Sequence, residues 1–212
     1  MSVEAIDGRV ARGERTRRRV AEALIALLEA GVTEPTARQV AEQAGVSARI
    51  VFHHYDDMEQ LLRAAVAVQA ERHWNCMRPV DPSLSLSERV TRLVRQRGAL
   101  FDAIAPVRRA AALVEHRSPV VAAELARSRT SLRQELENLF APELSGLGSG
   151  RGEVLDALDL AAGWEAWDQL RHRMSLSTPG ARRVMGRMLG SLLDPPSSHV
   201  SGATHTGRTG GS

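Results

Sequence analysis

Residues 36–55 read Thr-Ala-Arg-Gln-Val-Ala-Glu-Gln-Ala-Gly-Val-Ser-Ala-Arg-Ile-Val-Phe-His-His-Tyr, and this stretch decides the fold. The pattern is typical of two short helices joined by a tight turn, the unit that places a helix in the major groove of DNA. Ala41 is small where the helices cross, Gly45 can adopt the positive φ that ends the first helix, and Val51 packs the second helix against the first. The alternative is an ordinary helical hairpin, because short patterns of this kind also arise without DNA binding.

Capping residues predict where the helices of this unit begin. Thr36 followed by Gln39 fits a capping box, so we expect the first helix to begin just after Thr36. Ser47 stands at the position from which a side chain can cap the second helix. Asp56 or Asp57 is expected to cap the helix that follows.

These residues resemble the tetracycline-repressor (TetR) family of bacterial transcription regulators. The resemblance covers residues 14–62 and is carried by residues 36–41, 44–47, 51–55 and 61–62. It implies a DNA-binding head and a helical body that binds a ligand and dimerises. It also implies that a homodimer, joined through its two C-terminal helices, binds a palindromic operator in double-stranded DNA as a repressor and is released by a small-molecule effector.

Two positions depart from the family pattern. The family usually has tyrosine, whose hydroxyl reaches a phosphate, where this chain has Phe52, and it tends to have lysine where this chain has Met58. The chain contains no lysine, so all 28 of its basic residues are arginines. Arginine can bind a phosphate or a guanine edge through two N–H groups at once. We therefore expect arginines to make the contacts that these two positions do not.

The second helix of the unit is expected to enter the groove. Arg49 is the best candidate for reading a base directly, and Arg38 matches a family position that reaches either a guanine edge or a phosphate. We expect Thr36, His54 and Tyr55 to hold the DNA backbone. The predicted DNA-binding residues are Thr36, Arg38, Ser47, Ala48, Arg49, Ile50, Phe52, His53, His54 and Tyr55.

A basic segment precedes the unit. Six arginines fall between Arg9 and Arg19, next to only Glu14, although the formal net charge of the chain is just +3. For Arg9 and Arg12, a phosphate or minor-groove contact and a solvated tail stay open as alternatives, whereas arginines 15–19 favour the phosphates. The predicted domains are a flexible basic arm (1–13), a DNA-binding domain (14–62), a ligand-binding and dimerisation domain (63–194) and a disordered tail (195–212).

Beyond the unit the chain is predicted to be almost entirely helical, because Ala, Leu, Arg and Glu dominate and few β-type alternations occur. This predicts an all-α fold of about nine helices. After the first three helices, the expected ranges are 57–77, 85–104, 106–116, 118–142, 153–174 and 179–193, with a loop over 144–152.

The last two predicted helices are candidates for the dimer contact. Apolar residues between Val154 and Met174 cover more than one helical face, and such a helix needs a second surface on which to bury them. The final helix adds Val184, Met185, Met188, Leu189, Leu192 and Leu193. The alternative is that these residues complete the core of a monomer.

Large apolar residues in the body are candidates for lining an effector site. For any single one of them, ordinary core packing is the alternative. Because few buried polar groups are evident, we expect an apolar or amphipathic ligand. The candidates are Trp74, Met77, Leu100, Phe101, Ile104, Leu113, Trp164 and Trp167.

Other classes of protein fit the sequence less well. The single Cys76 excludes an internal disulfide, and no signal peptide or membrane span is evident, so we expect a cytoplasmic protein. No nucleophile motif, metal-ligand cluster or cofactor fingerprint occurs, which predicts neither a metal nor a cofactor nor catalysis. A nonspecific architectural DNA-binding protein is the main alternative, and an all-helical carrier or enzyme is a weaker one.

Overall fold

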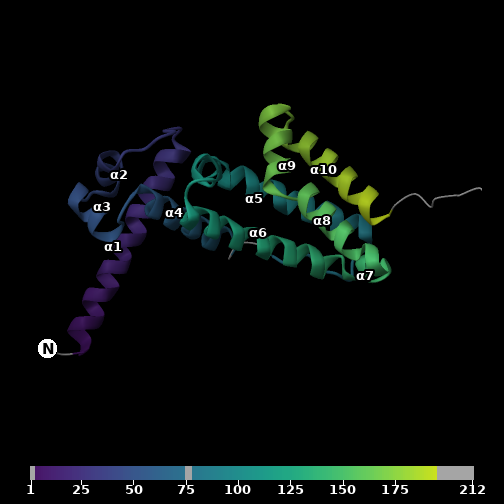
Figure 1. Ribbon diagram of the computed structural model, residues 1–212, viewed down its shortest axis with the longest axis horizontal. Helices are drawn as coiled ribbons and strands as arrows, with labels where there is room; N and C mark the ends of the chain where they lie inside the picture. Colours follow the sequence, from purple (N-terminus) through teal and green to yellow (C-terminus); the bar gives the residue numbers. More distant parts are fainter. Residues whose placement is uncertain (1–2, 75–77, 195–212) are drawn as a thin grey trace, which may run out of the picture.

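Helices form every regular element in residues 3–74 and 78–194, which the computed structural model describes. Figure 1 shows the first three helices at one end of an elongated molecule and α7 at the other. The all-α fold with an N-terminal helix-turn-helix head is therefore confirmed. The α-helices are α1 (Val3–Glu29), α2 (Ala37–Ala44), α3 (Ala48–His54), α4 (Met58–Trp74), α5 (Leu86–Val114), α6 (Pro119–Leu139), α7 (Ala141–Ser145), α8 (Arg151–Ala161), α9 (Trp164–Asp168) and α10 (Thr178–Leu193).

The head is joined to the body through α4. Its Leu61 and Ala65 are fully buried among side chains of α1 and α2, such as Leu24 and Val40. The same apolar cluster continues into α5 and α6, where it ends with Leu125 and its neighbours. The head and the near end of the body therefore share one core.

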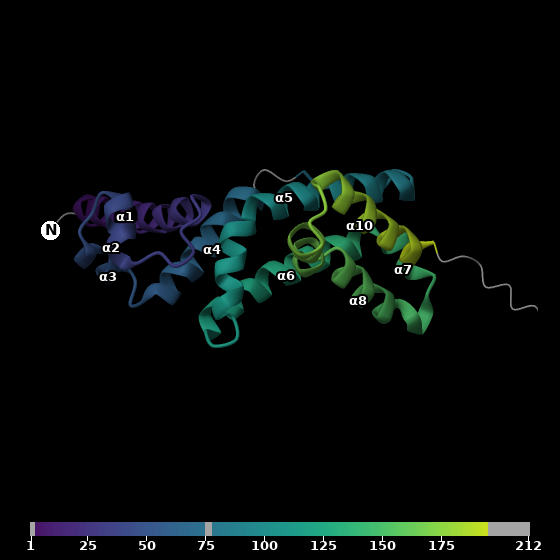
Figure 2. The ribbon, with the colours of Figure 1, turned by 90° about the horizontal axis from the view of Figure 1, so that it is seen from above.

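A second apolar cluster fills the rest of the body, where α10 lies along α5 (Figure 2). Met185 and Leu189 of α10 are fully buried in it. Gly98 of α5 allows α9 to lie very close, because a Cβ atom there would stand 2.6 Å from the indole of Trp167. That indole donates a hydrogen bond to Asp102 over 2.9 Å.

The predicted helices over 85–104 and 106–116 are a single helix, which corrects the sequence prediction. α5 continues through Pro106, even though an interior proline removes one backbone hydrogen bond and costs about 3 kcal/mol. Phe101 and Val107 are both buried on either side of it. We infer that burial on both sides offsets this cost.

The predicted helix over 153–174 is broken, which is a second correction. α8 ends at Ala161, and α9 begins after Gly163 and runs into a π-helical turn over Gln169–Arg173. A Cβ atom at Gly163 would lie 2.9 Å from the carbonyl oxygen of Asp159. The chain can therefore turn tightly here only because residue 163 is glycine.

The N-terminal end of the chain differs from the prediction, and the C-terminal end lies outside the described residues. Residues 3–13 are helical as the first turns of α1, rather than a flexible arm, and α1 there runs clear of the other helices (Figure 1). Residues 3–13 contain no proline and directly precede the well-buried part of α1. The helix can therefore propagate into them from that part. The predicted tail over 195–212 and the predicted end of the fourth helix at 77 lie outside the described residues.

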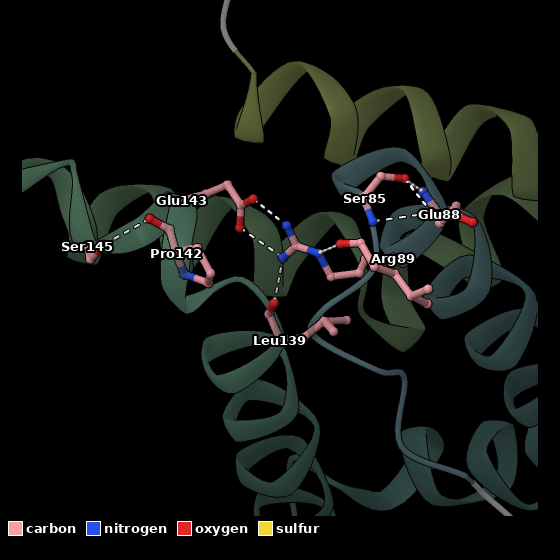
Figure 3. A network of polar contacts seen from close by, with 8 residues as sticks. Ser85, Glu88, Arg89, Leu139, Pro142, Glu143 and Ser145 are labelled. Atoms are coloured by element: carbon pink, nitrogen blue, oxygen red, sulfur yellow. Dashed lines mark hydrogen bonds and ion pairs between the residues drawn. The ribbon is translucent and has the colours of Figure 1, made fainter.

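Buried Arg89 ties the start of α5 to the corner between α6 and α7, as Figure 3 shows. Its Nη1 donates to the carbonyl oxygen of Leu139 over 2.7 Å and to Glu143 over 2.9 Å, and its Nε donates to the carbonyl of Leu84 over 3.0 Å. A second Glu143 oxygen accepts from Nη2. These hydrogen bonds hold the pKa of the Glu143 carboxyl below its ordinary value.

We expect Glu143→Gln to lower the free energy of unfolding by about 2 kcal/mol at pH 7, because Arg89 stays buried and loses its charged partner. Since the pKa of Glu143 is lowered in the folded state, its contribution is complete above the ordinary range of a glutamate and is lost as the pH falls through the lowered value. Urea unfolding between pH 7 and pH 2 should therefore show the two proteins converging in acid.

Glu137→Gln serves as the matched control. Glu137 accepts from Arg151 over 2.7 Å, but the two side chains are 32% and 49% exposed, so the expected change is below about 0.5 kcal/mol. Equal losses in the two variants would contradict the role assigned to the buried pair.

Candidate nucleic-acid interface

Thr36 and Gly45 set the two ends of α2. The Oγ1 of Thr36 accepts from the Gln39 backbone over 3.3 Å, and the Gln39 side chain accepts from the Thr36 backbone over 2.9 Å, which confirms the capping box. Gly45 has a φ of 63° and donates to Glu42 over 3.1 Å, so the helix ends as the sequence predicts.

α3 begins after Ser47, as predicted, although the Ser47 side chain makes no capping hydrogen bond. Asp57 does cap α4, because its carboxylate accepts from the backbone of Gln60 over 2.7 Å. The turn residue Val46 donates to the carbonyl of Ala41 over 3.0 Å. These backbone contacts fix α3 across α2.

α3 presents one face to the head and the other to solvent. Val51 is 1% exposed and packs on the core of the head. Phe52 is 54% exposed and Ile50 37%, so both of these large apolar side chains lie on the solvent side of α3. The exposed residues of the predicted groove set on and just before α3 are Ser47, Ala48, Arg49, Ile50, Phe52 and His53.

Tyr55 differs from its predicted role. Its side chain is 3% exposed, and its hydroxyl donates to the carbonyl oxygen of Arg17 over 2.9 Å. The Arg17 guanidinium lies over its ring at 5.4 Å, and burial raises the pKa of the Tyr55 hydroxyl. Because its hydroxyl donates to a carbonyl within the head, Tyr55 joins α3 to α1.

His54 lies half-buried beside His53, with the two rings 5.2 Å apart and edge to face. Burial, and then the neighbouring charges of His53 and Arg17, lower the pKa of the His54 imidazole. His54 is therefore neutral near pH 7, so it could offer a phosphate one N–H donor but no positive charge.

Arg38 and Thr36 lie exposed at the start of α2. The Arg38 side chain is 84% exposed, and its only recorded ion pair within the described residues is a loose one to Glu42 at 3.9 Å. Such a weak surface pair costs little to exchange for a phosphate or a base.

The arginines of α1 divide into two groups. Arg17 contacts Tyr55, and Arg18 pairs with Glu22 and with Glu71 of α4, at 3.2 and 2.8 Å. Arg12, Arg15 and Arg19 are exposed. The expectation of phosphate contacts for arginines 15–19 therefore remains open for Arg15 and Arg19, whereas Arg17 and Arg18 hold the head together.

The predicted effector-site residues do not all meet. Leu100, Phe101, Ile104 and Trp164 line one cavity of about 820 Å³. Trp167 is buried beside it, and Leu113 is 65% exposed near a smaller hollow between α1, α4 and α5. Of the two remaining candidates, Met77 and the side chain of Trp74 lie outside the described residues.

Sequence reasoning missed the polar residues of this cavity. Gln69, Arg97 and Arg108 line it and are each less than a tenth exposed. The only local signal is Gln69, which interrupts an apolar run from Ala64 to Ala70. This corrects the expectation of few buried polar groups in the body.

Across residues 3–74 and 78–194, no three His, Cys, Asp or Glu side chains gather closely enough to hold a metal ion. In the same part of the chain, every helix is too short or too polar to cross a membrane.

Comparison with known proteins points to one family. The family model described as "Bacterial regulatory proteins, tetR family" matches residues 20–65. A transcriptional regulator from Rhodococcus sp. Rha1 has a similar fold, with a TM-score of 0.63 and 20% identity over 84% of this chain and 95% of that one. A protein from Mesorhizobium loti assigned to the TetR family aligns with a TM-score of 0.48 and 15% identity over 86% and 96%. No match is found among curated proteins.

We expect Tyr55→Phe to lower the free energy of unfolding by about 1 kcal/mol, because the carbonyl of Arg17 loses a buried donor. Its affinity for a labelled DNA duplex at fixed salt should stay unchanged. Urea unfolding and fluorescence anisotropy measure the two quantities.

Arg38→Ala should leave the free energy of unfolding unchanged and weaken DNA binding. The slope of log affinity against log salt concentration should become smaller by about one released counterion. If Tyr55→Phe weakened DNA binding and left stability intact, Tyr55 would be a DNA contact after all.

Proposed function

Because the chain belongs, through its N-terminal domain, to the TetR family of bacterial regulatory proteins, we propose that it is a repressor that binds a palindromic operator as a homodimer and is released by a small molecule. The observation that carries the proposal is the exposed face of α3, which leaves Arg49 and its neighbours open to solvent. A repressor of this kind acts in the cytoplasm, where its operator is.

The recognition step assigns separate tasks to the two helices of the unit. Arg49 is on the first turn of α3, where a groove-inserted helix reaches base edges, and its guanidinium can bind O6 and N7 of a guanine together. Arg38 and Thr36 are exposed at the start of α2, from which phosphates can be reached. Phe52 offers apolar contact, for which the methyl group of thymine is a partner.

The dimer contact is proposed for the outward faces of α8 and α10. Many of the apolar residues expected there, including Leu158 and Met185, are buried in the monomer, so for them the alternative of core packing holds. Val184 is 36% exposed, whereas Leu160, which is 72% exposed, borders the cavity in the body. Met188 and Leu192 are only partly buried beside Val184 on α10. A twofold axis through this surface would place two copies of α3 about 34–36 Å apart, one turn of DNA.

Release by a small molecule is supported by the position of α4. This helix follows the recognition helix directly, and its Val66 and Gln69 line the cavity in the body. A ligand that binds more tightly when α4 is displaced shifts the protein toward that arrangement. In that arrangement the spacing of the two heads no longer matches the operator. A coupling of about 1–3 kcal/mol releases the DNA roughly 5–150-fold.

A nonspecific architectural role is the second candidate. The exposed Arg12, Arg15 and Arg19 on the N-terminal part of α1 favour contact with phosphates of any sequence. Such a protein would show a steep salt dependence and no preferred site. An all-helical carrier or enzyme is a weaker third candidate.

Selection of bound fragments from a random DNA pool tests the proposal. We expect a palindromic site to be enriched, and Arg49→Ala to bind it about 1–3 kcal/mol more weakly at fixed salt, with relaxed preference at one base pair in each half-site. Arg95→Ala is the matched control, an exposed arginine of α5 far from the head, and should bind as the wild type does. A pool with no enriched palindrome would favour the architectural alternative.

Val184→Glu tests the dimer. A carboxylate in the centre of an apolar contact should shift the protein to monomers in sedimentation equilibrium and weaken operator binding at least tenfold. Arg183→Glu, the adjacent exposed position, is the control for charge alone. A dimer that persisted in the Val184→Glu variant would exclude this surface.

A further inference from the structure

The cavity in the body is an apolar chamber bounded by α4, α5, α6, α8 and α9. Its volume of about 820 Å³ lies in the range of sites for drug-sized ligands. Along α5 it extends from Arg97 to Arg108, about 16 Å at the rise of an α-helix. Phe101 and Trp164 meet edge to face in its wall, with their ring centres 6.0 Å apart. The chamber therefore suits an elongated molecule with an apolar body.

Two buried N–H groups on residues that line this chamber have no hydrogen-bond partner within the described residues. One is Nε2 of Gln69, whose side chain is 3% exposed. The other is Nε of Arg97, whose Nη2 already donates to Leu132 and Glu135 at 2.7 and 2.8 Å. An unpaired buried donor costs about 1–3 kcal/mol, so such groups are rare in folded proteins. Both groups are donors, which makes an acceptor the complementary chemistry.

The charges around the chamber do not favour an anion. Its lining contains five arginines and five carboxylates. They pair with one another or with close neighbours, as Arg108 does with Glu165 at 2.7 Å and Arg133 with Asp159 at 3.4 Å. With the charges balanced, a carboxylate or phosphate would gain little to offset its loss of water.

We propose that the chamber binds an elongated, uncharged and mainly apolar molecule whose carbonyl oxygen accepts a hydrogen bond from the side-chain amide of Gln69. This inference names the effector class and rests on the proposed function for its regulatory meaning, although binding itself requires no DNA. The same chemistry fits a ketone, an ester or a lactone.

Because Gln69 lies on α4, this hydrogen bond connects the ligand to the helix that packs against the head. α4 packs against α1 of the head through Leu61 and Ala65, and it lines the chamber through Val66 and Gln69. A bound carbonyl therefore attaches directly to the helix that positions the head. The apolar part of the ligand lies against α5, α6 and α9, so the ligand bridges α4 to the rest of the body.

The test uses four probes of equal chain length: 2-undecanone, 1-undecanol, undecanoate and undecylammonium. Dissociation constants are measured without DNA by titrating the tryptophan fluorescence, to which Trp164 in the wall contributes. We expect the neutral ketone and alcohol to bind at least tenfold more tightly than either ion. Tighter binding of an ion would overturn the proposal.

Gln69→Leu removes the donor and keeps an apolar side chain of similar size. We expect it to weaken 2-undecanone about tenfold, or about 1.4 kcal/mol, and to leave the melting temperature of the free protein equal or higher, because an unpaired buried amide is gone. Gln69→Glu is the second variant. At a pH where the introduced carboxyl is ionised, this side chain can only accept hydrogen bonds. The hydroxyl of 1-undecanol can donate one and the carbonyl of 2-undecanone cannot, so the alcohol should bind better than the ketone.

Gln60→Leu makes the same change on the same helix but outside the lining, and it should leave every affinity unchanged. An unaltered affinity of the Gln69→Leu variant for 2-undecanone would overturn the proposal.

Operator release is measured separately, by anisotropy of the selected operator with and without saturating 2-undecanone. Binding of the ketone through Gln69 without release would leave the site assigned and contradict the regulatory part of the proposed function. Operator binding by a protein that takes up none of the neutral probes would leave the proposed DNA recognition intact and overturn this inference.

Discussion

The burial of α4 on two sides is the constraint on which the rest of the structure depends. Leu61 and Ala65 complete the core that holds α1 and α2, while Val66 and Gln69 of the same helix line the chamber in the body. A helix buried in this way cannot shift toward one side without repacking the other, since protein interiors are as dense as organic crystals. A change in the occupancy of the chamber thus has a short mechanical route to the head, through packed side chains of one rigid element.

Much of the head could be predicted from the sequence, because its geometry depends on neighbours within four residues. The capping box at Thr36, the cap at Asp57 and the left-handed conformation of Gly45 are all formed as the local spacing predicts. The exposure of Arg49 also follows from local pattern, since Val51 marks the opposite face of a two-turn helix.

The errors arise where a distant contact overrides a local preference. Pro106 predicts a helix end, yet α5 continues because its buried residues belong to both apolar clusters. Tyr55 is a residue type that can bind a DNA phosphate, but its hydroxyl donates a hydrogen bond to the carbonyl oxygen of Arg17, 38 residues earlier in the chain. Gln69 and Arg97 give no sign of lining a common chamber, because they are brought together only when α4 and α5 pack. Such pairings require the three-dimensional structure.

The arginine pairs of the body have a consequence for the conditions that the fold can tolerate. Arg89 and Arg97 are both buried, and each donates to a carboxylate of a neighbouring helix. A guanidinium keeps its proton in alkaline solutions where a lysine ammonium has begun to lose its own. The chain has no lysine, so none of its interhelical ion pairs depends on an amine. A body held together in this way should withstand carbonate-buffered, strongly basic surroundings better than a lysine-bridged relative of equal stability at neutrality.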